Sequence, residues 1–74
     1  MYNGHKDWNH WNVSLWINND EGLYLTARDF VRTSKNKTEA AVRMVDFMAS
    51  FNGGKTPDGA LYNVPSVRAA MVDM

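Results

Sequence analysis

Side chains that can bind a metal ion come together at one place in this sequence, near its N-terminus. His5, Asp7 and His10 are all metal-ligand types. Neither a helix nor a strand points these three side chains in the same direction. The chain has no cysteine, which excludes a thiolate zinc site and a disulfide framework. We therefore expect a solvated polar N-terminus with neither a metal nor a cofactor.

Residues for covalent or acid–base catalysis form no recognisable set. A capping or surface role explains each of Ser14, Ser34, Ser50 and Ser66. The glycine pair that starts at Gly53 matches neither a phosphate-binding loop nor a dinucleotide fingerprint. A chain this short also has little material to enclose a pocket of about 300 Å³ and keep a core. We expect no enzymatic activity.

Tryptophan is unusually dense in one segment. Trp8, Trp11 and Trp16 are the three tryptophans of the 74-residue chain. Large rings commonly complete a small core, but at least one of these rings should stay partly exposed whether residues 8–18 form a helix or a strand. Because tryptophan dominates many protein interfaces, we predict that all three are anchors for a partner protein.

Basic residues follow the tryptophans. Arg28 and Arg32 are spaced i and i+4, so they share one helical face, where they could make bidentate contacts with carboxylates of the partner protein. With Lys35, Lys37 and Arg68 they could instead contact phosphates, as in a small DNA-binding regulator of the helix-turn-helix kind. Eight Lys and Arg balance eight Asp and Glu, so no net charge favours nucleic acid or a membrane.

The first element that must position these side chains is ambiguous. In residues 8–18, Val13, Leu15 and Ile17 alternate with other residues, which is the period of a half-buried strand. A lone strand lacks a partner, however, and a helix with Asn12 as its N-cap also fits. We favour the helix, and keep an α+β fold with a strand or hairpin at residues 11–18 as the alternative.

The next two elements are clearer. Residues 20–34 carry apolar side chains at helical spacing behind an acidic start. Asn18, Asn19 or Asp20 could be the N-cap of this helix.

The following helix should begin at Asn36 or Thr38, and Asn36 and Glu39 have the spacing of a capping box. Gly53 and Gly54 should end this helix. The short link between the two helices predicts a helical hairpin.

The C-terminal part begins with a turn at residues 56–59, continues as a brief extended piece, and closes with a helix near Pro65. The sequence thus predicts a mainly α fold, a compact bundle of three or four short helices. It should form a single domain over residues 1–74, with a loosely ordered N-terminus at residues 1–7. The expected core is Leu15, Leu23, Ala27, Phe30, Val31, Ala41, Val45, Met48, Val67 and Met71.

Targeting signals are not evident in the sequence. The N-terminal residues are polar and aromatic rather than a signal-peptide run. No stretch approaches the roughly 20 apolar residues of a membrane-spanning helix. We expect a cytoplasmic protein that has no membrane partner, and that could form a homo-oligomer, as small domains often do.

Two stretches resemble small uncharacterised proteins encoded by phages and plasmids. They are His10-Trp11-Asn12-Val13-Ser14-Leu15-Trp16-Ile17-Asn18-Asn19-Asp20-Glu21-Gly22-Leu23-Tyr24 and the C-terminal Thr56-Pro57-Asp58-Gly59-Ala60-Leu61-Tyr62 with Ser66-Val67-Arg68-Ala69-Ala70-Met71. The resemblance implies an accessory protein of a mobile element. With the surplus of aromatic residues, it leads us to expect a non-catalytic protein that binds and modulates a host protein, for example an anti-CRISPR-type inhibitor.

The C-terminal stretch alone is also similar to the closing part of recombinase helix-turn-helix domains. The shared features are a Thr-Pro-x-Gly turn, an aromatic residue and a short Ser-Val-Arg helix. In those domains the final helix meets DNA. Here Ala69, Ala70 and Asp73 stand where a recognition helix would carry basic residues.

Overall fold

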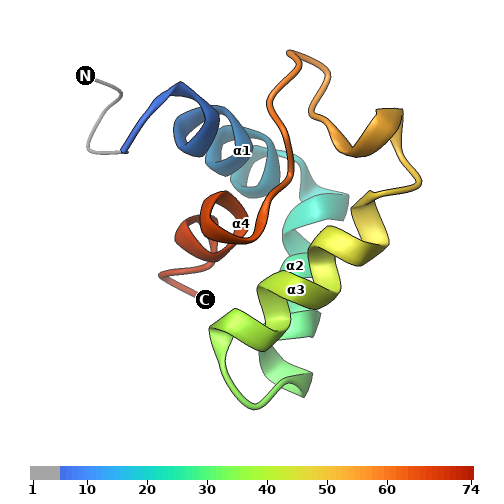
Figure 1. Cartoon of the computed structure of the whole chain (residues 1–74). Helices are drawn as coiled ribbons and strands as arrows, with labels where there is room; N and C mark the ends of the chain where they lie inside the picture. Colours follow the sequence, from blue (N-terminus) through green and yellow to red (C-terminus); the bar gives the residue numbers. More distant parts are fainter. Residues whose placement is uncertain (1–5) are drawn as a thin grey trace.

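Four α-helices and one short 3₁₀ turn make up the part of the chain that the computed structural model describes, residues 6–74 (Figure 1). The elements are α1 (Trp8–Asn19), α2 (Glu21–Thr33), α3 (Lys37–Met48), η1 (Asn52–Gly54) and α4 (Val64–Ala70). The predicted mainly α bundle is confirmed.

Residues 8–18, which the sequence left ambiguous between helix and strand, lie in helix α1. Its N-cap is Asp7, whose carboxylate accepts a hydrogen bond from the His10 N–H at 2.9 Å. The strand or hairpin at residues 11–18 is therefore wrong, and so is Asn12 as the N-cap. Asn12 lies inside the helix and is buried, because its side chain bonds residues far along the chain instead of its own helix start.

Helices α2 and α3 form the predicted hairpin. Asp20 caps α2 through the Leu23 N–H at 3.0 Å, and Asn36 caps α3 through the Glu39 N–H at 2.8 Å. The Glu39 carboxylate returns to the N–H of Lys35 at 3.0 Å, one residue before the cap. Because the free N–H groups are satisfied locally, both caps were among the candidates that the sequence offered.

The end of α3 differs from the prediction. The helix stops at Met48, before the glycine pair, in a tightened turn where the Ala49 N–H reaches the carbonyls of both Val45 and Asp46. Gly53 and Gly54 follow in η1 with φ of 67° and 76°. Their left-handed backbone, which is costly for other residues, reverses the chain after the helix instead of ending it.

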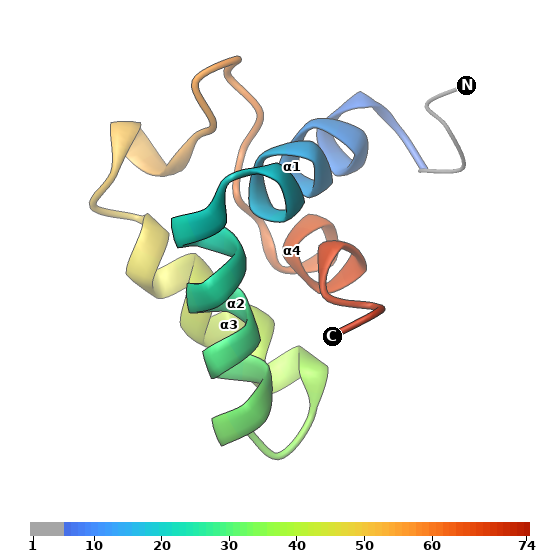
Figure 2. The same cartoon turned by 180° about the vertical axis from the view of Figure 1, so that it is seen from behind.

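A segment that we call the crossing loop, residues 55–63, leads from η1 back to α4. The predicted turn is present: the Gly59 N–H bonds the Thr56 carbonyl at 2.9 Å, with Gly59 at φ 95°. Lys55 and Leu61 pair as an isolated antiparallel bridge. In Figures 1 and 2 this loop lies at the opposite end of the α2–α3 hairpin from the hairpin turn.

The core lies where α4 packs on α1 and α3, with α2 closing the other side of α1 and α3. Of the predicted core, Leu15 is wrong: it is half-buried beside Trp16 and outside the main apolar cluster. Ala27, Ala41, Met48, Val67 and Met71 are buried, and Leu23, Phe30, Val31 and Val45 are half-buried against them.

The loosely ordered N-terminus expected at residues 1–7 lies mostly outside the described residues, which begin at residue 6. Asp7, which is described, is the N-cap of α1. Among residues 6–74, no helix combines the length and the apolar character that crossing a membrane requires.

Candidate functional site

One face of α1 carries polar side chains to the crossing loop. Asn9, Asn12 and Trp16 are spaced by three and four residues, so they point the same way from the helix. The Asn9 side-chain amide donates to the carbonyl of Leu61 at 2.9 Å and accepts from the Leu61 N–H at 2.8 Å. It also donates to the Ser66 hydroxyl at 2.8 Å, which ties α4 to the same helix.

Asn12 is the centre of this contact. Its side chain is 2% exposed, and its carbonyl oxygen accepts from the Thr56 hydroxyl at 2.6 Å. Its amide nitrogen donates to the Asp58 carboxylate at 2.9 Å. Thr56 in turn accepts from the Ala60 N–H at 3.0 Å. Within residues 6–74 every buried side-chain polar atom has a partner, so this contact is fully satisfied.

Trp16 is the third residue of this contact, and its ring extends from the contact to the surface groove described next. Its indole N–H donates to the same Asp58 oxygen at 2.9 Å. The hydrogen bonds from Asn12 and then Trp16 lower the pKa of Asp58, so the carboxylate stays ionised near neutral pH. The bond fixes the plane of the half-buried indole ring, which then forms one wall of a groove.

This hollow, which we call the aromatic groove, has a volume of about 440 Å³ and lies between the ends of α1 and α3, the start of α2 and the crossing loop. Its apolar lining is Trp16, Leu23, Phe47, Met48, Phe51, Pro57 and Tyr62, and its polar rim is Asp20, Gly22, Thr26, Asn52 and Lys55. The sequence predicted no hollow of this size. The groove is open to solvent and is bounded by helix ends and a loop, so it does not take space from the buried core.

Two phenylalanines leave large apolar surface at the groove. Phe47 is 44% exposed and Phe51 is 50% exposed. Their ring centroids are 5.3 Å apart, and the Phe47 ring meets Phe30 edge-on at 5.9 Å. Arg43 covers the other end of this row, with its guanidinium 4.8 Å from the Phe30 centroid. The contacts between rings hold Phe47 and Phe51 in place while their outer faces remain open.

Tyr62 is a groove side chain whose pKa is shifted by its surroundings. Burial, and secondly the negative charge of Asp20, raises the pKa of the Tyr62 phenol. That phenol therefore stays protonated at neutral pH. Asp20 uses one carboxylate oxygen as the cap of α2. The groove thus offers an apolar surface with a charged rim.

The three predicted tryptophan anchors do not form one patch. Only Trp16 lines the aromatic groove. Trp8 is exposed and Trp11 is half-buried, both farther toward the N-terminal end of α1. Partner binding by the three tryptophans stays a prediction. Trp16 also has a structural contact, because its indole N–H bonds the Asp58 carboxylate.

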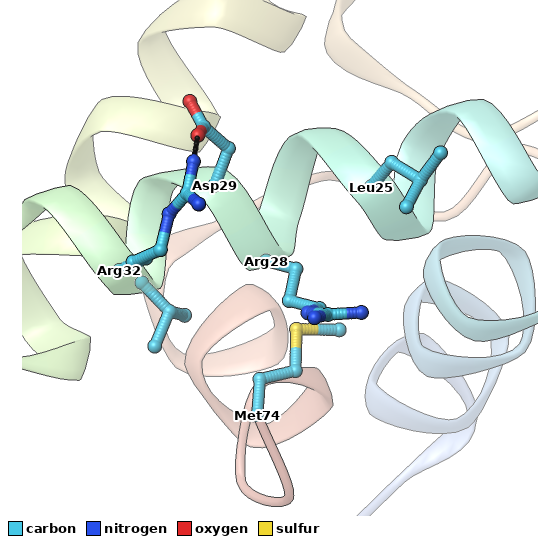
Figure 3. A pocket seen from close by; sticks show the side chains of 6 residues that line it. Leu25, Arg28, Asp29, Arg32 and Met74 are labelled. Carbon is cyan, nitrogen blue, oxygen red and sulfur yellow. Dashed lines mark hydrogen bonds and ion pairs between the residues drawn. The ribbon is translucent and has the colours of Figure 1, made fainter.

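Arg28 and Arg32 line a separate hollow of about 450 Å³ with Leu25, Asp29, Val31 and Met74. Figure 3 shows Arg28 extending alongside Met74 while Arg32 turns toward Asp29. The Arg32–Asp29 ion pair is 2.6 Å long and exposed, so it contributes little to stability. This hollow and the aromatic groove share no residue, which separates the predicted arginine contacts from the Trp16 surface.

The remaining basic residues proposed for phosphate contact are partly engaged. Lys37 donates to the Val72 carbonyl at 2.6 Å, and Arg68 donates to the Thr38 hydroxyl at 2.8 Å. The side chain of Lys35 is exposed. Both engaged side chains link α3 to the C-terminal part of the fold.

His5, one of the three metal-ligand types near the N-terminus, lies outside the described residues. The arrangement of His5 with Asp7 and His10 is therefore not described. In residues 6–74 the histidine and acidic side chains form no group of three that could hold a metal ion.

Phe47 and Phe51 were missed by reasoning from the sequence. Their i, i+4 spacing was a usable signal, because it places two rings side by side just where the helix ends. Asp58 was read only as a turn residue, since nothing near it in sequence reveals its bonds to α1.

Comparison with known proteins gives one result over the full length. Residues 1–74 match the model of a family described as "Family of unknown function (DUF7249)", and the chain belongs to that family. No curated protein and no solved structure matches the chain.

Proposed function

We propose that this chain is a non-catalytic binding protein of a phage or other mobile element, which docks on a host protein in the host cytosol and modulates it. Inhibition of a defence nuclease or CRISPR complex is one specific form of this role. The mobile-element origin rests on the resemblance of residues 10–24, 56–62 and 66–71 to phage and plasmid proteins. The binding role rests on the aromatic groove.

The observation that carries the proposal is the pair of half-exposed phenylalanines beside a preformed apolar groove. Large rings held in fixed positions lose little side-chain entropy when a partner covers them. Aromatic residues of this kind supply much of the energy of protein interfaces. Phe47, Phe51 and Trp16 are therefore the anchors of the proposed interface.

The test uses the immobilised full chain to retain proteins from a host-cell lysate, followed by an affinity measurement on the retained protein. Phe47→Ala and Phe51→Ala should each weaken binding at least about tenfold, as expected for central aromatic anchors. Val42→Ala is the matched control, because Val42 is 50% exposed on the same helix but lies outside the groove.

Equal binding by the wild type, both phenylalanine variants and Val42→Ala would contradict the proposal. Trp16→Ala is a poorer probe, because it also removes a hydrogen bond to Asp58 and disturbs the crossing loop.

A second candidate function is a small DNA-binding regulator that uses Arg28, Arg32, Lys35, Lys37 and Arg68. The observation in its favour is the excess of basic over acidic residues in residues 28–43. Phosphate contacts would make binding fall steeply as salt rises, whereas an interface of aromatic anchors would respond weakly. A salt titration of the retained complex separates the two.

A further inference from the structure

We infer that the aromatic groove binds a segment of the partner protein that places apolar side chains on Phe47 and Phe51 and an adjacent arginine or lysine on Trp16, between the carboxylates of Asp20 and Asp58. This inference rests on the proposed function and adds to it the chemistry of the partner. It commits the groove to a basic, apolar segment rather than an acidic one.

The first support is the position of two carboxylates around one indole ring. Asp20 follows Trp16 by one helical turn and shares with it both the groove and a smaller neighbouring hollow of about 260 Å³. Asp58 holds the indole N–H from the side of the crossing loop. The ring is therefore flanked by negative charge, and the face of an indole ring itself attracts cations.

The second support is that each carboxylate keeps unused accepting capacity. Asp20 commits Oδ1 to the Leu23 N–H, and Asp58 commits Oδ2 to Asn12 and Trp16. Among residues 6–74 the other oxygen of each carboxylate receives no hydrogen bond and forms no ion pair. Both carboxyl groups are on exposed residues, so a cation from a partner can reach those free oxygens.

The third support is the distribution of charge along the hairpin. Asp20 and Glu21 lie at the start of α2, and Asp58 lies in the crossing loop, with Lys55 as the basic residue of the groove rim. Residues 28–37, toward the far end of the hairpin, hold Arg28, Arg32, Lys35 and Lys37 with one acid, Asp29. Although the net charge of the chain is zero, the end of the molecule that carries Asp20, Glu21 and Asp58 is acidic. This end complements a basic segment and repels an acidic one.

The test begins with an unbiased selection. A displayed library of random twelve-residue peptides is selected on the immobilised 74-residue chain, with the Phe51→Ala variant as the counter-selection. Peptides enriched on the wild type should combine at least two large apolar residues with a neighbouring arginine or lysine. A synthetic form of the strongest peptide then serves as the probe for affinity measurements.

The matched variant is Asp20→Asn combined with Asp58→Asn. Asparagine is as good an N-cap as aspartate, and its side-chain oxygen can still accept from Asn12 and Trp16, so the fold is kept while both charges are lost. Affinity for the peptide should fall about five- to tenfold. Asp73→Asn, which removes an exposed acid near the C-terminus, should leave the affinity unchanged.

Four results would overturn the inference. The first is that enriched peptides are acidic or show no charge preference. The second is that no peptide is enriched over the Phe51→Ala counter-selection, and the third is that the double variant binds the peptide as the wild type does. The fourth is self-association of the free chain in light scattering that the Phe51→Ala variant abolishes, because the occupant would then be a second copy.

The same double variant separates this inference from the proposed function. If a retained host protein depends on Phe47 and Phe51 but not on the two carboxylates, the binding role stands and the basic segment is wrong. If binding depends on neither pair, both fail.

Discussion

Two adjacent regions of this molecule differ in how far their side chains are satisfied within the chain. In the contact between α1 and the crossing loop, Asn9, Asn12 and Trp16 each have a partner within the chain. In the aromatic groove, Phe47 and Phe51 leave about half of their surface uncovered. Trp16 belongs to both regions. The difference shows that contacts within the chain can use up an aromatic side chain, so the density of aromatic residues in the sequence does not by itself locate exposed apolar surface.

The largest effect on stability is expected for Asn12→Ala, in the contact between α1 and the crossing loop. The change leaves the buried Thr56 hydroxyl without its acceptor and removes a tie to the turn of the crossing loop. An unsatisfied buried polar group and a small cavity should lower the free energy of unfolding by about 2 kcal/mol. For a domain of this size that corresponds to a fall in Tm of ~10 °C, measurable by circular dichroism.

Asn19→Ala is the matched control, because Asn19 is on the same helix but is exposed and makes no side-chain hydrogen bond within residues 6–74. Its free energy of unfolding should change by less than about 0.5 kcal/mol. If both variants unfold at the same temperature, the hydrogen bonds of Asn12 to the crossing loop do not stabilise the fold.

The next effect is smaller and depends on pH. Because its hydrogen bonds lower the folded-state pKa of Asp58 below the ordinary value of 3.8, the ionised carboxylate stabilises the fold above that value. This contribution is lost as pH falls from 3.8 through the folded-state pKa. The wild type should therefore exceed Asp58→Asn in stability at neutral pH, and the gap should close in acid.

Urea unfolding of both proteins over a series of pH values measures that gap. A gap that is constant from neutral pH to strong acid would mean that the charge of Asp58 does not contribute through Asn12 and Trp16.

The smallest effect on stability is expected in the other region, for Phe51→Ala. The Phe51 ring is half-exposed and packs on the ring of Phe47, so its loss should lower the free energy of unfolding by less than about 1 kcal/mol. Thermal unfolding measures this change. A loss as large as that of Asn12→Ala would place Phe51 among the residues that hold the fold, and would contradict its assignment to the open groove.

Much of the fold could be predicted because its signals are local. The caps Asp20 and Asn36 bond N–H groups three residues ahead, and the turn at residues 56–59 closes on itself. Such patterns are complete within a few residues of sequence. The apolar spacing of residues 20–34 likewise identified α2 before the structure did.

What could not be predicted depends on residues that are distant in sequence. Asn12 has the type of an N-cap, yet its partners Thr56 and Asp58 lie more than forty residues away. The groove is assembled from α1, α2, α3 and the crossing loop, so no single window of sequence contains it. Phe47 and Phe51 resemble ordinary core residues until the end of α3 at Met48 is known.

The bidentate bond between Asn9 and Leu61 has a consequence for aggregation. Neighbours of Leu61 pair with η1 and Thr56, through the Tyr62 N–H to Gly54 and the Thr56 N–H to Ala60. The N–H and carbonyl of Leu61 face the opposite side, where a strand of another molecule could add, and the carbonyl also accepts from the Asn63 N–H at 3.0 Å. The carboxamide of Asn9 takes both groups, as a backbone amide would. One side chain thereby seals the open edge of a miniature β-ladder against intermolecular pairing.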